Sequence, residues 1–155
     1  MDLAVVQSRA SEGIDAPPVR VEVALGPGLP GVELIGTHST VGRQARERVK
    51  AALRASGFDM PVRKITVNLA PAELPKEGGR FDLPIAVGIL AANGDLPRPA
   101  LSARMLIGEL ALTGELLPTR GILPAALAAR AAGARKSGSA GMPSPWSASR
   151  MPSSA

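Results

Sequence analysis

Residues 74–94, LPKEGGRFDLPIAVGILAANG, begin with a charged loop that contains two glycines and continue into an apolar run. Loops that lead into a helix often carry functional groups, because the first N–H groups of the helix have no partner within it. The run from residue 81 to residue 94 predicts a buried helix that ends at Gly94. Pro84 fits the first turn of that helix, where proline costs little. The loop is therefore the first place to look for chemistry.

On both sides of this stretch, apolar residues follow the periods of strands and helices. Residues 3–8, 18–25, 32–36, 62–70 and 105–112 predict strands, and only the turn GPGLPG separates the second from the third, so we expect a hairpin there. Residues 40–56 predict a helix that Ser39 or Thr40 caps and Gly57 ends. Residues 122–134 predict a last helix. This order is typical of an α/β (α+β) domain.

The length of 155 residues is that of about one domain. The chain has no cysteine, which excludes disulfides and thiolate sites and fits a reducing compartment. Its N-terminus lacks the basic start of a signal peptide, and no apolar run approaches the roughly 20 residues that span a membrane. We therefore expect a soluble, cytoplasmic protein without a membrane partner.

The composition changes at Lys136. Residues 136–155 are rich in serine and proline and show no apolar period, so we expect a domain at 1–135 and a disordered tail at 136–155. The net charge is +5, and no acidic residue follows Glu115. This balance permits contact with nucleic acid, although three aromatic residues are too few for a single-strand stacking platform.

Two kinds of site are excluded by missing residues. The Walker A motif G-x-x-x-x-G-K-S/T does not occur, because GARKSG continues with Ser139 and Ala140 where lysine and a hydroxyl residue are required. This chain alone should therefore not hydrolyse ATP. His38 is the only histidine, so we predict no metal site and a solvent-facing turn histidine.

A basic stripe runs along the helix predicted at 40–56. Arg43, Arg46, Lys50 and Arg54 follow one another at spacings of three, four and four residues. Such a stripe could track a phosphate backbone, and these four residues are our candidates for DNA binding. It could equally be a solvated helix surface or a contact between subunits.

The loop of the opening stretch carries Lys76, Glu77, Arg80 and Asp82 around two adjacent glycines. A carboxylate near a lysine could do acid–base work, but the loop holds no serine or cysteine as a nucleophile. We therefore interpret Lys76, Arg80 and Asp82 as a structural or intersubunit loop, in which Asp82 interacts favourably with the helix dipole.

Several stretches match one protein family closely. They include LAVVQSRA, GIDAPPVRVEVALGPGLPGVELIG, ITVNLAPAELPKEGGRFDLPIAVGILAA and IGELALTGELLPTRGILPAALAARAAGA, and together they cover nearly all of residues 1–135. On these motifs the chain resembles the N-terminal (Lon-like, ChlI-type) domain of the Mg-chelatase-like competence ATPases, the ComM/YifB family. The resemblance implies the ribosomal protein S5 domain 2-like fold, which the proteolytic domain of Lon shares.

The same resemblance tests the loop for protease chemistry. In Lon-type proteases the corresponding loop carries a nucleophilic serine, and that position falls on Arg80 here. The partner lysine falls on Leu123. A protonated guanidinium cannot attack a carbonyl and leucine cannot accept a proton, so the resemblance implies a domain without the Ser-Lys dyad and without catalytic residues.

For function, the family implies a hexameric AAA+ ring that binds ATP and Mg and acts as a DNA helicase in branch migration during natural transformation. The matching pattern stops at Arg135, so neither ATP binding nor helicase activity carries over to this chain. The expected role is ring assembly or DNA contact. The alternatives are a stand-alone oligomerisation module and a peptidase that uses Ser39 or Ser56. Residues 36–42 of this chain read GTHSTVG, where the family usually has a proline and an acidic residue. This chain therefore lacks the acidic N-cap that is usual for the first helix of the family.

Overall fold

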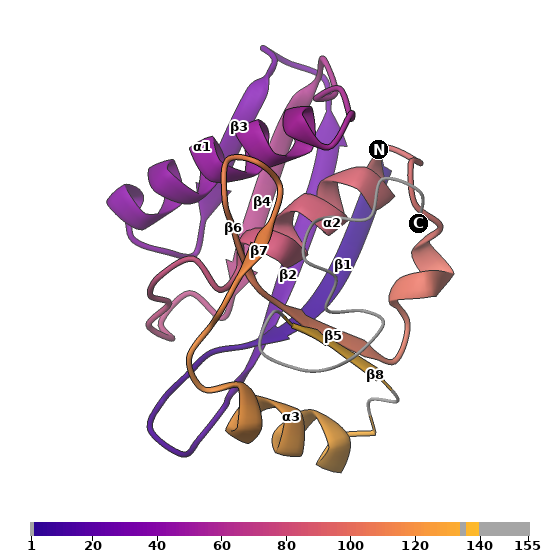
Figure 1. Cartoon of the computed structure of the whole chain (residues 1–155). Helices are drawn as coiled ribbons and strands as arrows, with labels where there is room; N and C mark the ends of the chain where they lie inside the picture. The colour runs from indigo at the N-terminus through magenta and orange to yellow at the C-terminus, as the bar shows by residue number, and fades with distance from the viewer. Residues whose placement is uncertain (1, 134–135, 140–155) are drawn as a thin grey trace.

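The computed structural model describes residues 2–133 and 136–139, which contain a six-stranded mixed sheet with helices on both faces (Figure 1). The sheet order is β3-β4-β2-β1-β5-β8. Its strands are β1 (Asp2–Arg9), β2 (Pro18–Gly26), β3 (Gly31–Ile35), β4 (Lys64–Ala70), β5 (Arg104–Ile107) and β8 (Lys136–Ser139). A separate antiparallel pair consists of β6 (Glu109–Leu110) and β7 (Leu116–Leu117). The expected α/β class is confirmed.

Helices α1 (Ser39–Ala55) and α2 (Asp82–Ala92) pack against each other on one face of the sheet (Figure 1). All residues of α2 are buried, as its apolar sequence predicts, because the helix lies between α1, the strands and β6. On the sheet, alternate residues such as Val21 and Val23 face this core, whereas Glu22 and Asn68 lie on the other face and share a 2.8 Å hydrogen bond.

Helix α3 (Ile122–Ala131) covers the opposite face of the sheet at β5. Met105 and Ile107 pack with Ala125 and Ala129 of α3, whereas Leu106 belongs to the core under α2. Neighbouring residues of a strand point to opposite faces, so β5 has a helix on each side. A short 3-10 helix, η1 (Arg98–Leu101), precedes β5.

Two crossover units organise the sheet. In the first, α1 connects β3 to β4, and in the second α3 connects β5 to β8; each pair of strands is parallel and adjacent. The predicted hairpin between residues 18–25 and 32–36 is therefore wrong. β4 lies between β2 and β3, antiparallel to β2 and parallel to β3. A parallel neighbour requires a crossover, which α1 supplies, and β2 pairs with β1 on its other side.

The predicted helix ends are partly confirmed. Gly57 follows α1 with a φ of +89°, and its amide bonds the Arg54 carbonyl at 3.1 Å. The predicted cap is wrong: His38 is the N-cap residue, it makes no side-chain capping hydrogen bond, and Ser39 already lies inside the helix. The side chain of His38 is exposed, as expected for a turn histidine.

The predicted disorder is wrong for residues 136–139, because they form β8. A parallel strand is held by backbone hydrogen bonds to β5, which do not require the apolar period that the sequence lacks. Residues 140–155 lie outside the described residues. The predicted strand at 105–112 is divided into β5 and β6 by Gly108, whose amide bonds the Arg80 carbonyl at 2.9 Å.

None of the helices in the described part of the chain has both the length and the apolar character that crossing a membrane requires.

Candidate functional site

The loop before α2 and the first residue of that helix carry three of the four buried polar side chains in the described part of the chain. Within residues 2–133, the four side chains are Ser8, Lys76, Arg80 and Asp82. Lys76 and Arg80 are each 6% exposed and Asp82 is fully buried. The three predicted loop residues are thus buried, and each bonds to a different set of segments.

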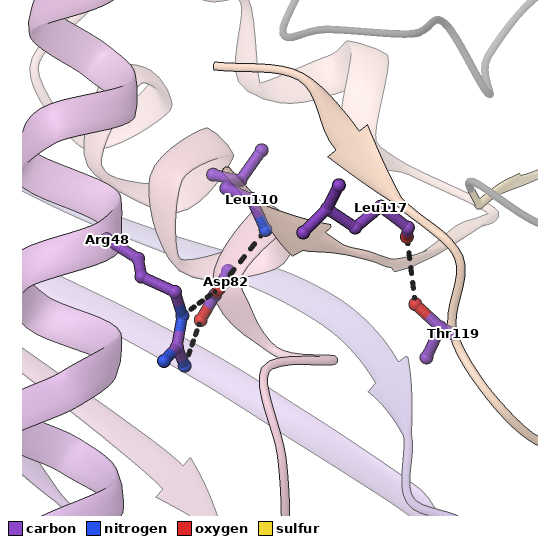
Figure 2. Close-up of polar contacts among 5 residues, drawn as sticks. All are labelled: Arg48, Asp82, Leu110, Leu117 and Thr119. Atoms are coloured by element: carbon purple, nitrogen blue, oxygen red, sulfur yellow. Dashed lines mark hydrogen bonds and ion pairs between the residues drawn. The ribbon is translucent and has the colours of Figure 1, made fainter. Parts of the chain in front are cut away.

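Asp82 forms an ion pair with Arg48 (Figure 2). Arg48 of α1 donates from Nε to Oδ2 at 2.6 Å and from Nη2 to Oδ1 at 3.2 Å, and the Leu110 amide of β6 donates to Oδ2 at 3.1 Å. Burial raises the pKa of Asp82 to about 6, although its hydrogen bonds to Arg48 and Leu110 act in the opposite direction. One carboxylate therefore connects α1, α2 and β6.

Lys76 is surrounded by carbonyl oxygens. Its Nζ donates to Gly36 at 2.7 Å, to Leu74 at 2.9 Å and to Pro71. An ammonium group has three N–H donors, so all three are used. Burial lowers the pKa of Lys76. The side chain joins the end of β3 to the loop after β4.

Arg80 joins two other segments. Its Nε donates to the Arg9 carbonyl at 2.9 Å, at the end of β1, and its Nη1 donates to the Arg120 carbonyl at 2.7 Å, just before α3. Its Nη2 is buried and has no hydrogen-bond partner. Burial lowers the pKa of Arg80, and no carboxylate within the described residues forms an ion pair with it.

Arg80 also lines a cavity of about 730 Å³ beside the loop. The other walls carry Glu77, Gly78, Gly79, Glu109 and Arg120, with residues 10–12, Pro75, Pro118 and Thr119. Gly79 allows the close approach of β6, since a Cβ at this position would lie 2.5 Å from Cγ of Glu109. The cavity is therefore polar and lined by charges of both signs.

The two positions that the resemblance to Lon-type proteases assigns to a Ser-Lys dyad hold Arg80 and Leu123. Arg80 is fixed by two carbonyls, and Leu123 lies on α3 with 68% of its surface exposed. The cavity walls include hydroxyl groups from Ser11 and Thr119, but no lysine or histidine that could take their protons. Thr119 donates instead to the Leu117 carbonyl at 3.5 Å (Figure 2).

The serines of the peptidase alternative are placed no better. Ser39 is exposed at the start of α1, and Oγ of Ser56 is buried without a hydrogen-bond partner. In the described part of the chain, neither hydroxyl bonds to a lysine, and no group of three His, Cys, Asp or Glu side chains could hold a metal ion.

The basic stripe lies on the outer side of α1. Arg43 and Arg54 are exposed and Lys50 is half-buried. Arg46 is more engaged, because it lies 3.8 Å from Glu47 and donates to the Val32 carbonyl at 3.5 Å. The four residues follow one side of the helix and are separate from the loop and its cavity.

Sequence reasoning missed Arg48, Glu109 and the carbonyls that hold Arg80. Arg48 lies off the basic stripe, on the side of α1 that faces the start of α2. Its position off the stripe was the only feature of the sequence that could have indicated a separate role. The carbonyls of Arg9 and Arg120 are backbone groups far apart in the chain, so no motif could have indicated them.

Comparison with known proteins identifies the family. The family described as subunit ChlI of Mg-chelatase matches residues 21–137. The competence protein ComM of Haemophilus influenzae is 52% identical over 130 residues, or 84% of this chain and 26% of that relative. The protein YifB of Salmonella typhimurium is 50% identical over 133 residues, or 86% of this chain and 26% of that relative.

A further YifB, from Escherichia coli, is 49% identical over 126 residues, which cover 81% of this chain and 25% of that relative. The chain thus spans about a quarter of the length of the curated relatives it matches. The chain belongs to the Mg-chelatase ChlI family and is related to the ComM and YifB proteins over most of its length.

Proposed function

We propose that the chain is the non-catalytic N-terminal domain of a ComM-like AAA+ ATPase, a DNA helicase of branch migration, and that it serves ring assembly or DNA contact. One observation carries the proposal. The charged loop residues hold strands and helices together, and the dyad positions are occupied by Arg80 and Leu123, which cannot perform nucleophilic catalysis. The order of strands and helices supports the further proposal of a ribosomal protein S5 domain 2-like, Lon-like fold.

ATP and Mg belong to the full-length protein in this proposal. The residues of this chain do not fit ATP, because no Walker A sequence occurs in them to cradle phosphates. A hexameric ring, its motor activity and a cytoplasmic location are proposed for the full-length relatives and reach this chain only through the family.

DNA contact is assigned to Arg43, Arg46, Lys50 and Arg54. Their support is placement, since they line one side of α1 and none is buried. Phosphate contacts release counterions, so binding of a short fluorescent duplex should weaken steeply as salt rises. Changing all four residues to glutamate should abolish this binding in fluorescence anisotropy.

A matched control changes four other exposed basic residues to glutamate: Arg20, Lys64, Arg98 and Arg130. This variant has the same net charge and should retain much more binding than the stripe variant. If both variants lost DNA binding equally, the binding would depend on the net charge of the protein and not on the stripe. Binding unchanged in the stripe variant would exclude DNA contact by α1. Absence of salt-dependent binding by the wild-type chain would leave the oligomerisation module as the function.

A peptidase remains the weaker alternative, and purified protein should not cleave fluorogenic casein. If casein were still cleaved after replacement of Ser39 and Ser56 by alanine, the nucleophile would have to be another residue, outside the loop and the dyad positions.

A further inference from the structure

The charge of Arg80 is buried without an anion to balance it. Two residues further along the chain, Asp82 is equally buried, but it has Arg48 as its partner. Arg80 has only two carbonyl oxygens as acceptors, and Nη2 has none. A buried charge without a partner is costly, and a guanidinium stays protonated rather than losing its charge. An anion that bound at Arg80 would therefore balance a buried charge that the folded protein leaves unpaired.

The guanidinium is also held in one orientation before any ligand arrives. The bonds from Nε and Nη1 run to carbonyls of two separate segments, next to β1 and α3. Fixing a long side chain in advance removes the entropy that binding would otherwise lose. A guanidinium with its remaining N–H groups available matches the planar shape of a carboxylate.

The cavity that Arg80 lines has a size and charge that narrow the ligand. About 730 Å³ is within the range of small-molecule and peptide pockets. Glu12, Glu77 and Glu109 line it together with Arg80 and Arg120. Three carboxylates oppose a ligand with several negative charges, such as a nucleotide or DNA, and favour one whose single carboxylate is accompanied by a cationic group.

We propose that this cavity binds the carboxylate of a peptide, with Arg80 as the anchor and with Glu77 and Glu109 facing a cationic group of the same peptide. Nη2 is shielded from solvent, so the carboxylate reaches it only when the side chains that cover it move aside. The carboxylate could belong to a free peptide segment or to a second copy of this chain. The inference does not rest on DNA contact by α1.

The test is a titration of the ¹⁵N-labelled full chain, followed by NMR. The probes are N-acetyl-Lys-Ala-Ala with a free carboxylate, the same peptide with a terminal amide, and inorganic phosphate. We expect the free acid to shift the Gly78 and Gly79 amides and the Arg80 side-chain resonance saturably. The amide should bind about tenfold more weakly or worse, because it loses a charge-assisted hydrogen bond. Phosphate should bind more weakly than the free acid.

Variants localise the effect. Arg80→Gln should abolish the preference for the acid over the amide, and Glu109→Gln should weaken binding of the lysine-containing acid while strengthening binding of phosphate. Arg98→Gln, at an exposed position in η1 outside the cavity, is the control and should bind the acid as the wild type does. If Arg80→Gln does not fold, the acid–amide comparison on the wild type and Glu109→Gln still decide the question.

The two sources of the carboxylate give different results. If a second copy supplies it, the Gly78 and Gly79 resonances should change on dilution, and Arg80→Gln should remove that change. Equal affinity for acid and amide would overturn the proposal. The proposal would also be overturned if the Gly78 and Gly79 resonances shifted neither on addition of the peptide nor on dilution of the protein.

Discussion

Lys76 donates to three carbonyl oxygens, and this complete set of acceptors makes it a structural residue. Replacing it with methionine removes this donor from the carbonyls of Gly36, Pro71 and Leu74, of which that of Pro71 also accepts from the Leu74 amide at 3.4 Å. We expect Lys76→Met to lower the free energy of unfolding by about 2–4 kcal/mol, because three hydrogen bonds from one buried ammonium group are lost together. Urea unfolding measures this loss. Lys64→Met, at an exposed position, is the control and should change stability little.

Asp82 should make stability depend on pH. Its pKa is about 6 in the folded protein, against an ordinary value of 3.8, so the unfolded chain ionises first as pH rises. The stabilisation from the protonated group is fully present below pH 3.8 and is lost as pH rises through 6. The difference corresponds to about 3 kcal/mol.

We expect urea unfolding of the wild type to show this fall between about pH 4 and pH 7. Asp82→Asn should be less stable than the wild type but should lack this component of the pH dependence. Asp59→Asn, at an exposed carboxylate, should keep the wild-type profile. Parallel profiles for wild type and Asp82→Asn would assign the pH dependence to other groups.

Helix α2 and strand β2 approach each other closely at Gly88. A Cβ at this position would lie 2.6 Å from Cγ2 of Val23 and 3.5 Å from Cγ2 of Val6. Gly88→Ala therefore overpacks the core, and the loss outweighs the gain in helix propensity, so we expect destabilisation of about 1–2 kcal/mol.

Gly42→Ala in α1 is the matched comparison. Its new Cβ would meet Cβ of Leu34 at 3.3 Å, on the edge strand β3, which has room to adjust. The change in stability should be within about 0.5 kcal/mol, because the tight contact and the helix propensity offset each other. Thermal unfolding of both variants checks the pair; equal effects would mean that α2 can move away from the sheet.

At the scale of elements, the spacing of apolar residues and the positions of glycine and proline predicted most helices and strands. The run at 81–94 and the alternation at 18–25 are local patterns, and both appear in the structure as α2 and β2. The partners of strands are not local. The order β3-β4-β2 depends on α1 returning the chain to the sheet, and a short turn between two strands does not contain that information.

At the scale of the whole molecule, the two cores differ in strength. The core under α2 contains large side chains such as Ile85, Ile89 and Leu90, whereas α3 buries mainly Ala125 and Ala129. Leu123 and Leu127 of α3 are 68% and 58% exposed. Because burial of alanine contributes little, α3 should open at a lower free energy than α2.

Native-state hydrogen exchange read by mass spectrometry checks this order. Peptides from α3 should exchange through local opening, and peptides from α2 should exchange only with global unfolding. Equal protection of the two helices would mean that the domain opens as one unit.

The candidate site could be predicted only in part. The sequence singled out the loop and its three charged residues, and the burial of all three is an observation of the structure. The assignment of Arg80 and Leu123 to dyad positions came from the family resemblance. The Arg48 partner, the cavity and the unpartnered Nη2 of Arg80 could not be found, because they depend on how α1, β1 and β6 meet around the loop.

The position of β4 between β2 and β3 has a consequence for synthesis of the chain. The ribosome makes β3 about 30 residues before β4, the only strand that pairs with it within the described residues. Until Ala70 has emerged, β2 can pair with β1 but has a bare second edge, and β3 has no sheet to join. We expect the nascent chain to be most prone to aggregation, and most dependent on chaperones, in this interval.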